Sequence, residues 1–306
     1  GCIMLLHRDE ELFREVISST AADLTLPVPI VEKDYYVTMI LKQLAEKAPD
    51  CVFKGGTSLS KCHHAIDRFS EDIDIAFSNT LTQGQRKKLK DKTIASISEE
   101  LSLPIADWAQ TQSRRDYNCY TFSYTPLGGA VPNSLIQGVK MEVSLGSISF
   151  PTMQLPMDSY VYQYLSKDNM DVVQEYHLQP FSMKLQTLER TLADKVFAVC
   201  DYYMTGKIKR NSRHLYDIYM LLPKVKQDAD FKELVHQVRE VRAGMEICPS
   251  AKAGVDIPEI LKKIIAEKVY FEDYESIMAY FQNHPLGYDT AITALEQIAE
   301  SNMFEE

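Results

Sequence analysis

The feature that most constrains this chain is the segment from Phe53 to Phe77, FKGGTSLSKCHHAIDRFSEDIDIAF. A glycine turn and the start of a Ser-rich helix precede a strand that carries two aspartates, Asp72 and Asp74. From Asp72 onward, polar or small side chains alternate with large apolar ones. Because a strand has a period of two, both aspartates are predicted on one face and the apolar side chains in a core.

Two carboxylates on one face repel each other unless cations lie between them. Hard divalent cations such as Mg²⁺ (or Mn²⁺) prefer one or two carboxylates together with phosphate oxygens and water. Upstream, Gly55 and Gly56 follow a short strand at 51–53 and open a helix whose first N–H groups can receive phosphate. This order of parts predicts a site for a nucleoside triphosphate and its metal ions. The hydroxyls of Thr57 and Ser58 either bond a terminal phosphate or cap the helix.

A third carboxylate follows in a predicted strand at 135–145, where Val139-Lys140-Met141-Glu142-Val143-Ser144-Leu145 alternates again. Glu142 is therefore a candidate third metal ligand, and simple edge-strand alternation is the other explanation. Arg68 and Ser70 flank the turn into the aspartate strand. Arg68 supports the loop or the phosphates, or it pairs with Glu71 or another acid. Ser70 orients the carboxylates, or it bonds backbone amides in the turn.

The apolar pattern divides the chain into an α/β part and a helical part. Helices are predicted over residues 8–48, with a break at 26–29, and over 84–101. A second strand is predicted at 117–124, and a Pro/Gly turn at 126–129 separates it from 135–145. From about residue 166 the pattern is helical. The strong runs are 187–204 and 212–222, followed by 228–304 with short breaks at 248–249, 257–258 and 284–285. We therefore expect an α/β (α+β) domain at 1–165 and a helical domain at 166–306.

Composition excludes several classes of protein. No segment reaches the roughly 18 apolar residues that span a bilayer, so no membrane association is expected, and Gly1 to Leu6 is too short for the apolar part of a signal peptide. Six cysteines without a C-x-x-C pair argue against a zinc or disulfide framework and favour the cytoplasm. The net charge of −10 is unusual for a nucleic-acid binder, although basic residues concentrate at 86–88, 114–115 and 207–213. Each basic run is either a solvated face or a local contact with nucleic acid.

Other residues allow two interpretations. Trp108 and the tyrosines near it form core or a platform for a base, and core is favoured. Lys54 and Lys61 are weaker phosphate candidates that we expect to face solvent. Glu32-Lys33-Asp34 is a charged helix turn that we expect to pack against the catalytic domain.

Two motifs of this chain together resemble the signature of the AbiEii/AbiGii-type nucleotidyltransferases. They are GGTSL and RFSEDID, the second with Arg68, Ser70, Asp72 and Asp74. These nucleotidyltransferases are toxin halves of abortive-infection toxin–antitoxin pairs with a DNA-polymerase-β-like nucleotidyltransferase fold. Three further segments are similar to that family, and they are VEKDYYVTMIL (31–41), TLERTLADKVFA (187–198) and RHLYDIYML (213–221). The resemblance implies a mixed sheet flanked by helices, Lys195 at the basic position of the third motif and Asp217 at the acidic position of the fourth.

The residues themselves leave the roles of Lys195 and Asp217 open. Lys195 lies at the edge of an apolar helical stripe, so its ammonium either reaches a triphosphate or extends to water. Asp217 follows Arg213 by four residues, which permits an ordinary salt bridge within the helix. In the functional interpretation Asp217 orients the acceptor hydroxyl, a metal ion or Lys195.

The resemblance implies transfer of a nucleotide from an NTP to an acceptor hydroxyl. Asp72, Asp74 and Glu142 hold two Mg²⁺ ions in this hypothesis, and Lys195 offsets charge on the departing pyrophosphate. RNA, with the tRNA 3′ end foremost, is the favoured acceptor, and a cognate antitoxin is an expected partner. The alternatives are transfer to a protein or a small hydroxyl compound, and an inactive binding module of the same fold.

Overall fold

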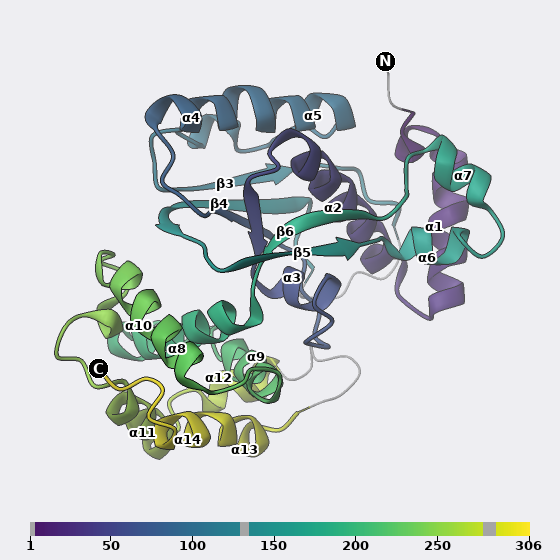
Figure 1. Cartoon of the computed structure of the whole chain (residues 1–306). Helices are drawn as coiled ribbons and strands as arrows, with labels where there is room; N and C mark the ends of the chain where they lie inside the picture. Colours follow the sequence, from purple (N-terminus) through teal and green to yellow (C-terminus); the bar gives the residue numbers. More distant parts are fainter. Residues whose placement is uncertain (1–3, 129–134, 278–285) are drawn as a thin grey trace. The chain divides into compact units, whose positions relative to one another are not determined.

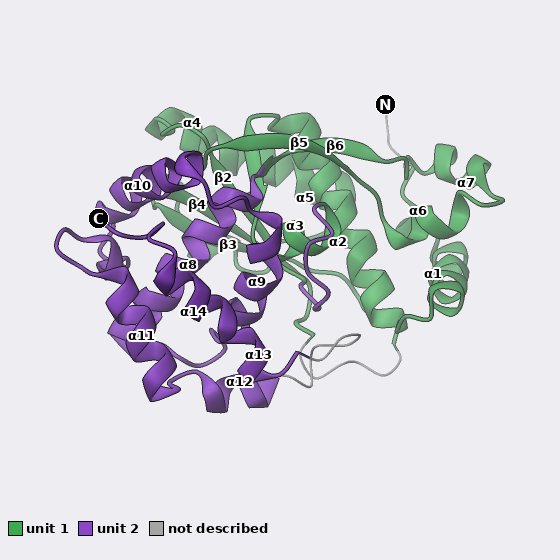
Figure 2. Cartoon of the chain, turned by 60° about the horizontal axis from the view of Figure 1, so that its bottom comes forward, with its two compact units in different colours: residues 1–62, 71–185 green, residues 63–70, 186–306 purple. Residues whose placement is uncertain are grey.

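A computed structural model of the chain describes residues 4–128, 135–277 and 286–306. Gly129 of the predicted turn and the predicted break at His284-Pro285 lie outside these ranges. The chain forms two compact units, coloured separately in Figure 2. Unit 1 comprises residues 1–62 and 71–185, and unit 2 comprises 63–70 and 186–306. The predicted domain boundary near residue 165 stays a prediction.

Unit 1 is built around a six-stranded mixed sheet with strand order β3-β4-β2-β1-β6-β5. Pairing is antiparallel for β1 with β2 and for β3 with β4, and parallel for β2 with β4 and for β1 with β6. The strands are β1 (Cys51–Lys54), β2 (Ile73–Phe77), β3 (Tyr117–Phe122), β4 (Val139–Ile148), β5 (Thr152–Met157) and β6 (Phe181–Gln186). This mixed sheet with its helices confirms the predicted α/β class.

Three features of the sheet differ from the sequence prediction. The predicted strand at 135–145 begins at Val139, because Gly138 adopts φ +73° and turns the chain just before it. The strands β5 and β6 were not predicted. Half of the β5 residues are exposed, and this edge strand contains Pro156, so it lacks the alternation by which a half-buried strand is recognised.

The helices of unit 1 begin and end where local chemistry dictates. Asp9 accepts a hydrogen bond from Leu12 N at the start of α1 (Glu10–Leu24), and Thr25 ends that helix in the left-handed region. Pro29 lies in the first turn of α2 (Val28–Lys47), as the predicted break requires. The remaining helical segments are α3 (Gly56–Lys61), α4 (Gln83–Lys88), a π-helical turn (Leu89–Ile94), α5 (Ala95–Leu101), α6 (Tyr160–Leu165) and α7 (Met170–Glu175).

Apolar side chains of the sheet and helices share one core in unit 1. Ile73 and Ile75 of β2 and Met141 of β4 are buried in it together with Leu41 and Leu44 of α2. In Figure 1, α2 and α5 lie close together, and they contact each other. Since the apolar side chains of β2 and β4 enter this core, their polar side chains must lie on the opposite face of the sheet.

Unit 2 is helical. The long helix α8 (Leu188–Thr205) begins at Thr187, whose hydroxyl accepts from Arg190 N, and ends at Gly206 in the left-handed region. It packs against α9 (Arg213–Leu221) and α10 (Ala229–Ala243). The other α-helices are α11 (Ile257–Glu267), α12 (Phe271–Ile277), α13 (Tyr288–Ala291) and α14 (Thr293–Glu300). Across the described ranges, no helix combines the length and the apolar character that crossing a membrane requires.

Candidate active site

Asp74 and Glu142 are paired residues on adjacent parallel strands. The register of β2 and β4 places Asp74 opposite Glu142, and each alternates with buried neighbours. Asp72 precedes β2 by one residue and has the same parity as Asp74. The predicted shared face for these three carboxyl groups is therefore present, and β4 is an interior strand of the sheet, which removes edge-strand alternation as the explanation for Glu142.

The crowding of acids changes their affinity for protons. Burial, together with the charges of Glu142 and Glu71, raises the pKa of Asp72 to about 6. Burial and a side-chain hydrogen bond with Glu142 raise the pKa of Asp74 well above its ordinary value. Two carboxylates this close repel each other, and either a shared proton or a cation between them would relieve that repulsion.

The donor set suits a hard cation. In the described part of the chain, Oδ1 of Asp72 is buried without a hydrogen-bond partner, and an orphaned carboxylate oxygen of this kind is a suitable ligand for Mg²⁺ or Mn²⁺. Within the same described residues, no three His, Cys, Asp or Glu side chains already stand together as a complete metal cage. Asp72, Asp74 and Glu142 therefore suit a hard cation by donor type and charge, but in the described residues they are not arranged as a three-ligand metal site.

The glycine turn lies directly against the aspartate strand. Gly55 has φ +85°, and a Cβ there would collide with the carboxyl group of Asp74. Only glycine combines this backbone conformation with so close an approach. Gly56 and Thr57 begin α3, and the Ser58 hydroxyl donates to Gly55 O over 2.7 Å. A phosphate contact from Ser58 would require the hydroxyl to leave that carbonyl.

Further polar groups surround the carboxylates on this face. Tyr117 donates from its hydroxyl to Glu142 Oε1 over 2.6 Å. Lys54 pairs in register with Asp74, and Lys140 lies two residues before Glu142 on the same strand. These two lysines oppose the rise in the pKa of Asp74 and Asp72, respectively. Sequence reasoning did not select Lys140, and it favoured core for the tyrosines near Trp108, whereas Tyr117 is exposed at this face. Both residues share the strand parity of the polar face.

Helix α2 supports the approach to Asp72 through buried ion pairs. Lys33 contacts Glu71 at 2.9 Å, and both side chains are buried. Asp34 pairs with Lys61 at 2.7 Å and accepts from Tyr160 N. Glu32-Lys33-Asp34 thus packs within unit 1, whereas the expectation that Lys61 faces solvent is wrong, because its side chain is only 8% exposed.

In unit 2 a buried ion cluster centres on Asp217. Its side chain is fully buried and accepts from Arg68 Nε at 2.7 Å and Nη2 at 2.8 Å. Lys195 Nζ lies 2.8 Å from the same carboxylate. Burial alone would raise the pKa of Asp217, but Arg68 and Lys195 outweigh it and hold that pKa far below its usual range. Two predicted site residues, Lys195 and Asp217, are therefore in direct contact. The Lys195 ammonium is paired inside the protein and does not extend to water, and the ion pairs of Asp217 among the described residues are with Arg68 and Lys195, not with Arg213.

His214 is a member of this cluster that sequence reasoning did not select. Its Nδ1 lies 3.2 Å from Lys195 Nζ, and its ring stacks on Tyr202 at 5.8 Å between centroids. Burial and the neighbouring Lys195 lower the pKa of His214 well below its ordinary value, so its ring is neutral and can accept from the ammonium. Burial also lowers the pKa of Lys195, which Asp217 opposes. The pattern RHLYDIYML holds the signal, since His214 precedes Asp217 by one helical turn.

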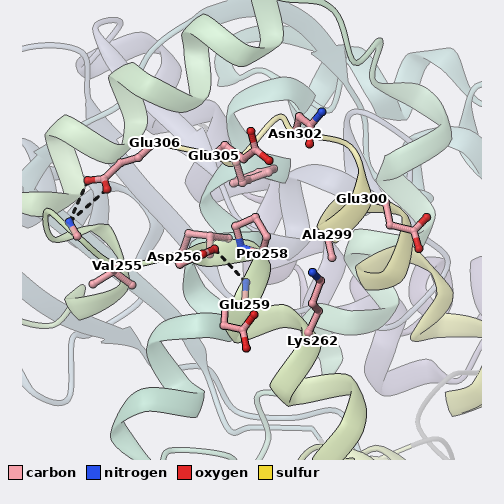
Figure 3. A pocket seen from close by; sticks show the side chains of 13 residues that line it. Val255, Asp256, Pro258, Glu259, Lys262, Ala299, Glu300, Asn302, Glu305 and Glu306 are labelled. Atoms are coloured by element: carbon pink, nitrogen blue, oxygen red, sulfur yellow. Dashed lines mark hydrogen bonds between the residues drawn. The ribbon is translucent and has the colours of Figure 1, made fainter.

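A cavity of about 630 Å³ lies elsewhere in unit 2, between the start of α11 and residues 299–306 (Figure 3). Its lining carries Asp256, Glu259, Glu300, Glu305, Glu306 and one lysine, Lys262. Such a surplus of carboxylates repels a triphosphate. None of the predicted site residues appears in this lining, so the cavity is not the candidate active site.

A mixed sheet that presents paired carboxylates beside a glycine turn is the architecture of a phosphoryl- or nucleotidyl-transferring enzyme. The family model for the nucleotidyl transferase AbiEii toxin of type IV toxin–antitoxin systems matches residues 40–294. Because this match covers most of the chain, the chain belongs to that family and is a nucleotidyltransferase toxin.

Two other comparisons complete this description. No curated protein matches the chain. Among solved structures, it is similar to the nucleotidyltransferase toxin MenT4 from Mycobacterium tuberculosis H37Rv, with 14% identity and a TM-score of 0.48 over 95% of this chain and 96% of that one. The family membership implies a nucleotide substrate and an antitoxin partner.

Proposed function

We propose that this enzyme transfers a nucleoside monophosphate from an NTP to a hydroxyl group of RNA, with the tRNA 3′ end as the acceptor. The observation that carries the proposal is the register pairing of Asp74 with Glu142, directly beside the Gly55 turn. Asp72, Asp74 and Glu142 hold Mg²⁺ or Mn²⁺ in this proposal. When bound, such ions activate an acceptor hydroxyl and offset the charge of the triphosphate.

The residues of the glycine turn and Ser70 have distinct roles in this proposal. The N–H groups at Gly55, Gly56 and Thr57 face the β- and γ-phosphates, and Ser58 contacts a phosphate oxygen through its hydroxyl. Ser70, two residues before Asp72, orients that carboxylate. The backbone freedom of Gly55 supports this arrangement, because it lets the turn approach Asp74 without a side chain between them.

The ion cluster of unit 2 supplies positive charge. Lys195 offsets charge on the departing pyrophosphate, Asp217 orients the Lys195 ammonium, and Arg68 fixes Asp217 through two hydrogen bonds and adds charge near the phosphates. Arg68 and Asp72 are four residues apart in the sequence, so even a fully extended chain keeps their Cα atoms within about 14 Å of each other. This covalent link supports a common role for the two groups.

The first test removes one proposed metal ligand. Asp72→Ala should lower the transfer of ³²P-labelled nucleotide by at least about a thousandfold, because one carboxylate of the proposed cage is lost. The assay incubates the enzyme with each α-labelled NTP and with total RNA, protein or small hydroxyl compounds in separate arms, which identifies the acceptor. The exposed Asp91 serves as the matched control, and Asp91→Ala should transfer normally. Unchanged turnover by a folded Asp72→Ala enzyme would refute the assignment.

A second test concerns the RNA. Lys207, Lys209 and Arg210 are exposed in the connection between α8 and α9, and we propose that they contact the phosphate backbone. Reversing their charges to Glu should weaken RNA binding and flatten its dependence on salt by about 0.7 in log–log slope per lost contact. Glu substitutions at the exposed Lys224, Lys226 and Lys263 are the control. Equal RNA affinity of the two triple variants would exclude this contact.

We place the reaction in the cytoplasm, where NTPs and tRNA are available.

A further inference from the structure

Tyr117 presents an exposed aromatic ring at the carboxylate face. It is the first residue of β3, an edge strand, and its side chain is 52% exposed. Trp108 differs, because Lys90 Nζ lies 4.7 Å from the centre of its ring and Tyr120 packs beside it. Trp108 is thus part of the packing, as the sequence favoured, whereas the Tyr117 ring is open to a partner.

Two contacts hold this ring in a defined place. The Tyr117 backbone pairs in register with Ser144 of β4, and its hydroxyl donates to Glu142 Oε1 over 2.6 Å. An aromatic ring fixed at both ends loses little conformational entropy when a flat ligand stacks on it. Aromatic rings of this kind bind the faces of nucleobases.

The loop before Tyr117 adds positive charge. Arg114 and Arg115 are both exposed, and the main chain around them is held from both sides. Arg86, which is buried, donates from Nη1 to Arg114 O at 3.0 Å and to Asp116 Oδ1 at 2.9 Å. Asn118 accepts from Gln112 N and donates to Gln112 O. Arg114 Nε donates to Gln112 Oε1, and Arg115 Nη1 donates to Gln110 O. The loop therefore presents two exposed guanidinium groups from an ordered backbone, and the exposed Asp116 separates them from the Tyr117 ring.

Strand order separates this surface from the glycine turn. In the sheet order β3-β4-β2-β1, Tyr117 lies on β3, Glu142 on β4 and Asp74 on β2, while Gly55 follows β1. Neighbouring strands lie about 4.8 Å apart, so the ring and the turn lie on opposite sides of the carboxylates. In-line displacement places the attacking oxygen and the leaving pyrophosphate on opposite sides of the α-phosphorus, so an acceptor is expected on the side of the carboxylates away from the glycine turn.

From this geometry we infer that Tyr117 stacks on a nucleobase of the acceptor RNA near its reacting end, while Arg114 and Arg115 contact the neighbouring backbone phosphates. The inference rests on the proposed function and names the acceptor side of the site. Single-stranded RNA is the ligand, because a base is free to stack only when it is unpaired. Two consecutive guanidinium groups suit a phosphate backbone better than they suit a single incoming nucleotide, whose triphosphate is assigned to the glycine turn.

Fluorescence anisotropy of a fluorescein-labelled single-stranded 12-mer RNA tests the inference in the presence of Mg²⁺ and without NTP. Tyr117→Ala should weaken binding by about tenfold or more, and Tyr117→Phe should stay within about threefold of wild type because the stacking ring remains. Arg114→Gln and Arg115→Gln should each reduce the log–log salt slope by about 0.7. Met153→Ala, at an exposed position on the opposite edge strand β5, is the matched control and should bind normally.

Three outcomes would overturn the inference. These are wild-type affinity of Tyr117→Ala for the single strand, an equal loss of affinity for a duplex of the same sequence, and a loss confined to binding of an α,β-methylene NTP. The last outcome would assign the ring to the incoming nucleotide. Failure of the proposed function is distinguishable, since binding is measured without turnover. Tyr117-dependent RNA binding by an enzyme that labels no RNA would leave the stacking contact standing and refute the transfer reaction.

Discussion

At the scale of single residues, burial and the mutual repulsion of Asp72, Asp74 and Glu142 favour the protonated forms of the two aspartates. The pKa of Asp72 rises from 3.8 to about 6, and the pKa of Asp74 is raised well above its ordinary value. A carboxyl group whose pKa is raised on folding contributes stability at low pH and loses it as the pH rises through the folded pKa. A divalent cation between the carboxylates removes the same repulsion without a proton.

This linkage predicts a pH-dependent effect of metal on stability. Without divalent cations, the contribution of these acids to the free energy of unfolding should fall as the pH rises from about 4 to above 6. Mg²⁺ or Mn²⁺ at millimolar concentration should then raise the melting temperature by a few degrees at pH 7.5 and by much less at pH 5. Differential scanning fluorimetry with EDTA as reference measures both.

Asp72→Asn/Asp74→Asn is the informative variant for this measurement. It should be at least as stable as the metal-free wild type at pH 7.5, because the repulsion is gone, and it should show no gain with metal. A metal-induced rise of equal size in this variant would mean that the ions bind elsewhere.

At the scale of elements, the strand–turn–helix formed by β1, Gly55 and α3 positions the glycine turn against Asp74. A Cβ at Gly55 meets the Asp74 carboxyl group, and φ is +85°. Gly254 has a matching φ of +83°, and nothing lies within 4 Å of its added Cβ. The two glycines therefore share the conformational strain that alanine would introduce but differ in the steric contact.

Comparing Gly55→Ala with Gly254→Ala isolates that contact. Both should lose about 1 kcal/mol of unfolding free energy from the left-handed backbone conformation. Gly55→Ala should lose a further 1–3 kcal/mol by displacing Asp74, and its transferase activity should be abolished. Urea unfolding and the labelling assay measure these effects. Equal stability losses, with activity retained in Gly55→Ala, would show that Asp74 moves aside without consequence.

At the scale of the whole molecule, the chain leaves unit 1 after Cys62, contributes residues 63–70 to unit 2 and returns at Glu71. This excursion carries Arg68 to Asp217, 149 residues away in the sequence, and Asp67 N donates to the Tyr216 hydroxyl nearby. His63 and Gln186 are the two residues at which the chain enters unit 2, and His63 Nε2 lies 3.0 Å from the backbone oxygen of Gln186. The helices of unit 2 thus depend on a segment that lies, in sequence, inside unit 1.

Arg68→Gln tests this dependence. The variant leaves the buried Asp217 with Lys195 as its remaining ion-pair partner among the described residues. Helices α8 and α9 should therefore unfold locally more often, although residue 68 lies far from them in the sequence. Hydrogen exchange followed by mass spectrometry should show exchange at least about tenfold faster in peptides covering 188–221. Lys207→Gln, at an exposed position, should leave exchange unchanged. Faster exchange confined to residues 51–77 would contradict the assignment of this segment to unit 2.

The sequence by itself determined the parts of this protein that depend on local periodicity. Alternation at 72–77 and 139–145 predicted the shared face of Asp72, Asp74 and Glu142, and the glycine pair predicted the turn before α3. Resemblance to one family added Lys195 and Asp217, and the family match confirms the enzyme class. These features are predictable because the alternation of side chains along a strand and the backbone conformations open to glycine depend on a few consecutive residues.

Only the tertiary structure decided which charged groups meet. Arg213, four residues before Asp217, offered the local salt bridge, yet the partners of Asp217 are Arg68 and Lys195. Lys61, expected in solvent, pairs with Asp34, and Tyr117 meets Glu142 across neighbouring strands. The physical reason is that a buried charge must be paired wherever the packing of elements places it, and that packing follows from the whole core and not from any short segment.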